Sequence, residues 1–305
     1  MDLRAFSRAV AVLAFVAGLG AAACSSPNGH LGKAISAGAA SPLPLAGQLA
    51  ARFTADAARR LEMLVAAFPG GAGIWIADPT TSAPVYSHNA EEEVLAASLY
   101  KLAVLMEAER RVDSGDLHYQ DTVAIGPLDV TDEGSVYEVG AVVGLDDALE
   151  TMITVSDNGT ALALWRLFGG ESIDAALARA GIADFHVTLD PAGDNITTPH
   201  AIGTFFTQLA RNELVSASAS ARMQARLERQ TIRDRLPAAL PDSVVVAHKT
   251  GNLVGLAHDA GIIFTAHGPL VVVVMTWDAD DATANAFIAD VGSLVYRVAE
   301  GAAVR

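Results

Sequence analysis

The chain has 305 residues, with 20 lysine or arginine and 35 aspartate or glutamate, and a formal net charge of −15 at pH 7. Such an acidic surface argues against nucleic acid as a partner and against a polybasic contact with a membrane. The single cysteine excludes an intramolecular disulfide bond, and the length suffices for one large domain.

The N-terminal segment has the pattern of an export signal. Arg4 and Arg8 precede an apolar run, residues 9–20, which is too short to span a bilayer. Small residues then precede Cys24, and this pattern resembles a bacterial lipoprotein cleavage site, although Ala21 stands where leucine is usual. This pattern predicts a signal peptide over residues 1–23, lipidation of Cys24, and a protein anchored by lipid on the extracytoplasmic face of the cell membrane. An ordinary secretory signal is the alternative.

Residues 24–45 are rich in serine, glycine, proline and alanine, which predicts a flexible tether before a domain over residues 46–305. The spacing of apolar residues predicts a helix over Leu49–Phe68, and two strands, Ala72–Ala77 and Val85–His88, form a predicted hairpin. Further helices are predicted over Ser98–Arg111, Leu145–Thr154, Gly159–Phe168, Ile173–Ala180, Pro199–Asn212 and Val215–Arg229.

Three strands and a helix complete the predicted order, over Ser243–His248, Ala260–Ala266, Leu270–Thr276 and Thr283–Glu300. Strands at both ends of the chain predict an α/β (α+β) fold with one antiparallel five-stranded sheet flanked by helices. The sheet layer would take residues 46–95 and 240–305. Residues 96–239 would form an inserted helical subdomain.

Lysine occurs only at Lys33, Lys101 and Lys249, and two of these stand in motifs suited to acyl transfer. Ser98 opens a predicted helix, and Lys101 lies three residues later on the same face, within reach of the serine hydroxyl. A deprotonated lysine beside a serine provides a base beside a nucleophile. A helix-capping serine with a surface lysine is the alternative.

Two further motifs are polar. In Ser156-Asp157-Asn158 the serine hydroxyl can relay a proton and the asparagine amide can hold a substrate carbonyl. The alternative is that the three residues cap the next helix. In Lys249-Thr250-Gly251 the ammonium and hydroxyl can hold an anion, and the glycine lets a substrate approach the strand. The alternative is a strand that ends and turns at this glycine.

Together, and in this order, the motifs resemble those of the class A β-lactamase and penicillin-binding-protein superfamily of serine hydrolases. The resemblance covers residues 96–102, 154–158, 187–190, 197–199 and 248–263. The alanine-rich N-terminal part is also similar to β-lactamase-related lipoproteins of the LppW type.

The resemblance implies a role for each matching residue. Ser98 would be the acylated nucleophile, Lys101 its base and Ser156 the proton shuttle. The substrate would be held by Asn158, Lys249, Thr250, Gly251 and Asn252, with the backbone N–H groups of Ser98 and Asn252 forming the oxyanion hole. Arg235 would help to bind the substrate carboxylate, with Arg233 or a surface salt bridge of Arg235 as alternatives.

One family element is missing. Class A enzymes hydrolyse the acyl-enzyme with water activated by a glutamate on an omega loop. Here only residues 191–196 separate Asp190 from Thr197, and Asp194 is the sole acid among them. Neither aspartate matches that glutamate, so acylation of Ser98 by β-lactams followed by slow hydrolysis is expected.

Two other functions stay open, namely a peptidoglycan D,D-peptidase and a non-catalytic envelope lipoprotein that senses cell-wall ligands. The expected partners are a β-lactam or a peptidoglycan stem peptide, and the chain is expected to be monomeric. No cofactor is expected. The sequence contains no His-x-x-x-His spacing, so no metal site is predicted. His258 and Asp259 are adjacent in a strand, so they are expected to point to opposite faces and to be structural.

Overall fold

The computed structural model describes residues 46–81, 83–130, 135–188 and 194–302. The predicted signal peptide, the tether and Cys24 lie outside these residues, as does Asp190. No helix of the described residues is long and apolar enough to cross a bilayer.

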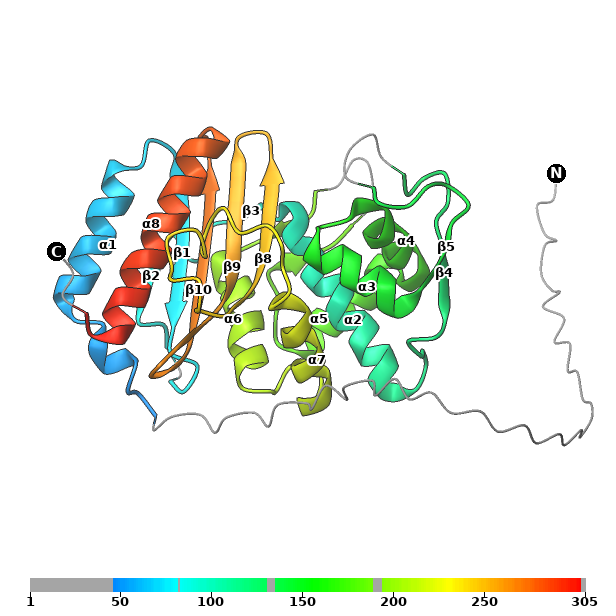
Figure 1. Cartoon of the computed structure of the whole chain (residues 1–305), viewed down its shortest axis with the longest axis horizontal. Coiled ribbons are helices and arrows are strands. Elements are labelled where there is room, and N and C mark those ends of the chain that lie inside the picture. The colour runs from blue at the N-terminus through cyan, green and yellow to red at the C-terminus, as the bar shows by residue number, and fades with distance from the viewer. Residues whose placement is uncertain (1–45, 82, 131–134, 189–193, 303–305) are drawn as a thin grey trace, which may run out of the picture. The chain divides into compact units, whose positions relative to one another are not determined.

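A five-stranded antiparallel sheet in the order β2-β1-β10-β9-β8 brings the two ends of the described chain together (Figure 1). This confirms the predicted fold class. Its strands are β1 (Gly71–Ala77), β2 (Tyr86–His88), β8 (Val246–Leu253), β9 (Leu256–Thr265) and β10 (Gly268–Trp277).

Alternate residues of β10 face two different cores. Val271, Val273 and Met275 belong to the core shared with the helical subdomain, whereas Val272 and Val274 pack with the terminal helices. The period of two follows from the strand pleat, and it leaves the sheet apolar on both faces. The terminal helices α1 (Ala55–Ala67) and α8 (Asp281–Glu300) cover the second face, at the left of Figure 1.

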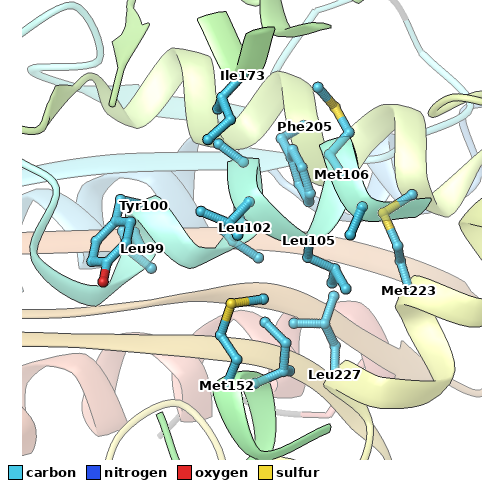
Figure 2. Packing of buried hydrophobic residues seen from close by; sticks show 14 of the residues in the cluster. Leu99, Tyr100, Leu102, Leu105, Met106, Met152, Ile173, Phe205, Met223 and Leu227 are labelled. Atoms are coloured by element: carbon cyan, nitrogen blue, oxygen red, sulfur yellow. The ribbon is translucent and has the colours of Figure 1, made fainter. Parts of the chain in front are cut away.

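The other face carries the helices of the middle of the chain. These are α2 (Tyr100–Ser114), α3 (Leu145–Thr154), α4 (Asn158–Phe168), α5 (Gly170–Arg179), α6 (Pro199–Ala210) and α7 (Ala217–Leu227). Helix α2 is their centre, because every residue from 100 to 109 is buried. Figure 2 shows Leu102 and Leu105 of α2 surrounded by Met152 from α3, Phe205 from α6 and Met223 from α7.

Two buried glutamates fix α2 among its neighbours. Glu107 accepts hydrogen bonds from Arg110 and Arg111 and from Ser172 of α5. Glu109 accepts 2.7 Å hydrogen bonds from the Tyr119 hydroxyl and from Arg222 Nε. Both glutamate side chains have 0% exposure, so their charges depend on these partners rather than on water.

Two small sheets shape the loops around α2. Strand β3 (Val94–Leu95) pairs with β7 (Ile196–Thr197), which pairs with β6 (Phe185–His186). The other sheet joins β4 (Thr122–Ala124) to β5 (Val142–Gly144). The β3–β7 pair places residues 194–197 beside the segment that leads to Ser98, and Ala96 N donates to Asn195 O at 2.7 Å.

The structure differs from the predicted elements at several ends. The helix predicted over Leu49–Phe68 is split into a 3-10 turn, η1 (Ala50–Arg52), and α1, because Phe53 and Thr54 are not helical. The strand predicted over Ser243–His248 begins at Val246 and continues to Leu253. The alternative of a strand that ends and turns at Gly251 was therefore wrong, because the pairing of β8 with β9 continues through the motif to Leu253.

Candidate active site

Ser98 lies in a 3-10 turn, η2 (Ala97–Leu99), that leads directly into α2. The turn places Lys101 back toward the serine, with Lys101 Nζ 3.2 Å from Ser98 Oγ. Ala97, just before the serine, has a φ of 44°, a left-handed conformation that costs energy for a residue with a Cβ atom. The sequence prediction that Lys101 reaches the Ser98 hydroxyl is confirmed.

Lys101 is completely buried and surrounded by oxygen atoms. Its Nζ donates to the backbone oxygen of Ser156, to Ser156 Oγ at 3.1 Å and to Asn158 Oδ1 at 2.7 Å. Burial lowers the pKa of Lys101 to about 7, with the negative charge of Asp157 opposing part of that shift. A substantial neutral fraction near pH 7 allows this amine to accept a proton.

The Ser156 hydroxyl bridges the two lysines of the site. Its Oγ lies 3.1 Å from Lys101 Nζ and 2.8 Å from Lys249 Nζ. A φ of 62° at Ser156 turns the chain so that its hydroxyl and its carbonyl both face Lys101. Burial, followed by the charge of Lys101, lowers the pKa of Lys249 well below its ordinary value.

Asp157 shows that the capping interpretation of this motif also holds. Its carboxylate accepts hydrogen bonds from Thr160 N at 2.7 Å and Thr160 Oγ1 at 2.6 Å, at the first turn of α4. It also accepts one from Val136 N. The three residues therefore divide their tasks, because Asp157 caps the helix while its two neighbours contact Lys101.

Gly251 permits close packing of β8 against the turn that carries Ser98. A Cβ atom at this position would lie 3.2 Å from Ala97 Cβ and 3.3 Å from Ala96 O. The glycine thus serves the protein's own packing. Lys249 and Thr250, 0% and 3% exposed, lie behind the surface, so direct contact with a substrate carboxylate stays a prediction.

Arg235 braces strands β8 and β9 instead of standing free at the surface. It is 5% exposed, and its Nη1 donates to Gly251 O at 2.8 Å and to His258 O at 2.9 Å. Its Nη2 donates to Asn252 Oδ1. The alternative of a salt bridge is met by Asp234, which lies 3.6 Å from Arg235 Nε and is exposed, although Arg235 itself is buried. Binding of a substrate carboxylate by Arg235 stays a prediction.

The two residues His258 and Asp259 do point to opposite faces, as expected. His258 Nε2 donates to Leu95 O at 2.9 Å, and its Nδ1 accepts from Thr276 N, which fixes a neutral tautomer. Burial lowers the pKa of His258 to about 4. Asp259 instead contacts His248 Nδ1 at 2.8 Å across the β8–β9 pair. This cross-strand partner was missed, because strand register is not readable from one strand alone.

A cavity of about 280 Å³ opens over Ser98. The predicted site residues Ser98, Asn158 and Asn252 line it, which brings both expected oxyanion-hole residues to one space. Its other walls, to which the sequence analysis gave no role in binding, are Leu95, Ala97, Tyr100, Asp194, Asn195 and Leu253. Within the described segments no group of three histidine, cysteine, aspartate or glutamate side chains forms a candidate metal site.

The β-lactamase enzyme family matches residues 56–299 of this chain. The chain belongs to that family. A β-lactamase of Streptomyces lavendulae is 27% identical over 282 residues, covering 83% of this chain and 90% of the relative. The chain is thus a serine hydrolase of the class A β-lactamase type, with distant relatives.

Solved structures share the fold. A β-lactamase from Sphaerobacter thermophilus superposes with a TM-score of 0.74 at 24% identity, covering 81% of this chain and 98% of the other. A mutant of PBP-A, solved as an acyl-enzyme complex with penicillin G, has a TM-score of 0.74 at 23% identity, covering 81% and 97%.

Proposed function

We propose that this protein forms a covalent acyl-Ser98 adduct with β-lactams and hydrolyses it slowly. The observation that carries the proposal is the continuous set of contacts from Ser98 Oγ through Lys101 Nζ and Ser156 Oγ to Lys249 Nζ. Such a set can take a proton from the nucleophile and deliver it to a leaving group without exposing an ion to water.

In the proposed acylation, neutral Lys101 accepts the hydroxyl proton of Ser98 while Ser98 Oγ bonds to the lactam carbonyl carbon. The carbon–nitrogen bond of the lactam then breaks. Ser156 gives its proton to the leaving nitrogen and regains one from Lys101, so that the proton lost by Ser98 ends on the nitrogen. The N–H groups of Ser98 and Asn252 would stabilise the oxyanion formed at the carbonyl.

Slow release of the acyl group follows from the loop that precedes β7. Hydrolysis needs a base that orients water onto the ester carbonyl. The sequence of this loop lacks the family's glutamate, and none of the acylation residues replaces it. The acyl-Ser98 ester would therefore persist longer than it takes to form.

A second candidate is a peptidoglycan D,D-peptidase, which would use the same nucleophile and base on a stem peptide. The likeness in fold to PBP-A, seen with penicillin G as an acyl-enzyme, favours it. As further parts of the proposal, Cys24 would carry a lipid that holds the protein on the outer face of the cell membrane. The domain would be a monomer.

One experiment separates long-lived acylation of Ser98 from rapid β-lactam hydrolysis and from non-catalytic binding. The purified protein is mixed with a fluorescent penicillin and, separately, a chromogenic cephalosporin, and intact mass is followed with time for the unchanged chain and for Ser98→Ala. A long-lived adduct that needs Ser98 supports the proposal. Fast cephalosporin turnover would contradict slow release, and no adduct, or one that survives Ser98→Ala, would leave the non-catalytic ligand sensor as the better function.

A further inference from the structure

An acidic side chain shares the cavity with the proposed nucleophile. Asp194 lines the same 280 Å³ space as Ser98 and Asn158. Asp194 is exposed to solvent, so its carboxylate can interact with a ligand bound in the cavity. No role in acylation requires an acid there.

The backbone beside Asp194 is held firmly. Asn195 O accepts from Ala96 N at 2.7 Å, and Asn195 Oδ1 accepts from Thr188 N at 2.6 Å. Ile196 then pairs with Leu95 in the β3–β7 ladder. These contacts tie Asp194 to the segment that leads into Ser98.

Asp194 is also the only charged group among the described residues that line the cavity. The other linings are apolar or are asparagine and serine, apart from Tyr100, whose pKa is raised by burial so that its phenol stays neutral. The two lysines, Lys101 and Lys249, are completely buried behind the cavity wall. A bound acyl group therefore meets one negative charge and no exposed positive one.

We propose that Asp194 makes the cavity select acyl side chains that carry a positive charge and disfavour those that carry a negative one. This inference rests on the proposed acylation of Ser98. A unit charge on the ligand at about 5–8 Å from a solvent-exposed carboxylate changes binding by about threefold to tenfold. The substrate class that fits is an acyl donor with a free amino group, such as an amine-bearing peptide.

A field effect suits the position of Asp194 better than catalysis by contact. A general base must lie within hydrogen-bond reach of the water that it activates, in a fixed orientation. A charge that selects among ligands needs only to share the cavity with them, and an exposed carboxylate meets that requirement. Activation of water by Asp194 is the competing outcome of the test.

The test uses three penicillins that share a phenylacetyl side chain and differ at its α-carbon. Ampicillin carries an amino group there, benzylpenicillin a hydrogen and carbenicillin a carboxylate. Rates of Ser98 acylation and adduct lifetimes are measured at pH 6.5, where an α-amino group is mostly protonated. The full chain is compared with Asp194→Asn, with Asp194→Lys, and with the control Glu93→Gln, which removes an exposed acid that is not part of the cavity lining.

The readout is the ampicillin-to-carbenicillin ratio of acylation rates, compared between variants so that intrinsic drug reactivity cancels. Asp194→Asn is expected to lower this ratio by about tenfold, Asp194→Lys to lower it further, and 0.5 M salt to weaken the effect. Glu93→Gln should leave it unchanged. An unaltered ratio in both Asp194 variants overturns the inference, as does a change confined to adduct lifetime, which would assign the residue to water activation. Absence of any adduct would instead refute the proposed function.

Discussion

The buried Lys101 predicts an unusual pH dependence of acylation. Its pKa of about 7, against an ordinary 10.5, results chiefly from burial. With that value about a tenth of the amine is neutral at pH 6 and about nine-tenths at pH 8. An unperturbed lysine would be below about 1% neutral at pH 8.

If neutral Lys101 is the base, the acylation rate should rise about tenfold from pH 6 to pH 8 and then level off. Stopped-flow fluorescence with a labelled penicillin measures this rate directly. Since Lys101 and Lys249 both contact Ser156, the midpoint belongs to the coupled pair rather than to one residue. A rate that is flat with pH, or that still climbs above pH 9, would refute the reasoning.

Lys101→Met supplies the matched comparison, because it keeps most of the buried volume and removes the base. The remaining rate should fall by about 10²- to 10⁴-fold and lose its rise between pH 6 and pH 8. The native state also holds Lys101 less protonated than the unfolded chain does. Stability from this group is therefore lost as pH falls from the ordinary pKa toward the lowered one, and urea unfolding should show a shallower pH slope for Lys101→Met.

Three further changes test packing and charge. Glu109→Ala removes the buried acceptor of the Tyr119 hydroxyl and of Arg222, while Arg222 keeps its contact with Asp113. Urea unfolding should therefore show a loss of about 1–3 kcal/mol, and an unchanged stability would contradict the assigned contacts. Gly251→Ala brings a methyl group to 3.2 Å from Ala97 Cβ. This crowding should lower the free energy of unfolding by about 1–3 kcal/mol and slow acylation of the neighbouring Ser98. An unchanged acylation rate would show that the turn carrying Ser98 shifts without harm. Burial acts to raise the pKa of Glu107, but hydrogen bonds from Arg110, Arg111 and Ser172 outweigh burial and lower the pKa. The stability of the protein should therefore fall as pH drops through and below the ordinary value of 4.5. In urea unfolding, Glu107→Gln should lose less stability in acid than the unchanged chain, and an equal loss would assign the acid dependence to other groups.

The amino-acid sequence by itself determined the order of the longer helices and of the five strands of the main sheet, and the residues that lie close to one another along the chain. The apolar period of α2 and the alternation in β10 depend on neighbours a few residues away, so they can be predicted from local pattern. The contact of Lys101 with Ser98 is of the same kind, since one helical turn separates them. The cap formed by Asp157 is equally local.

Only the tertiary structure decided which distant residues meet. Arg235 contacts Gly251 and Asn252 because the segment before β8 folds back over β8 and β9. Asp194 reaches the cavity of Ser98 because β7 pairs with β3. These contacts join residues that are far apart in the chain. Which residues meet depends on strand register and loop closure, and neither can be predicted from the spacing of residues within one segment.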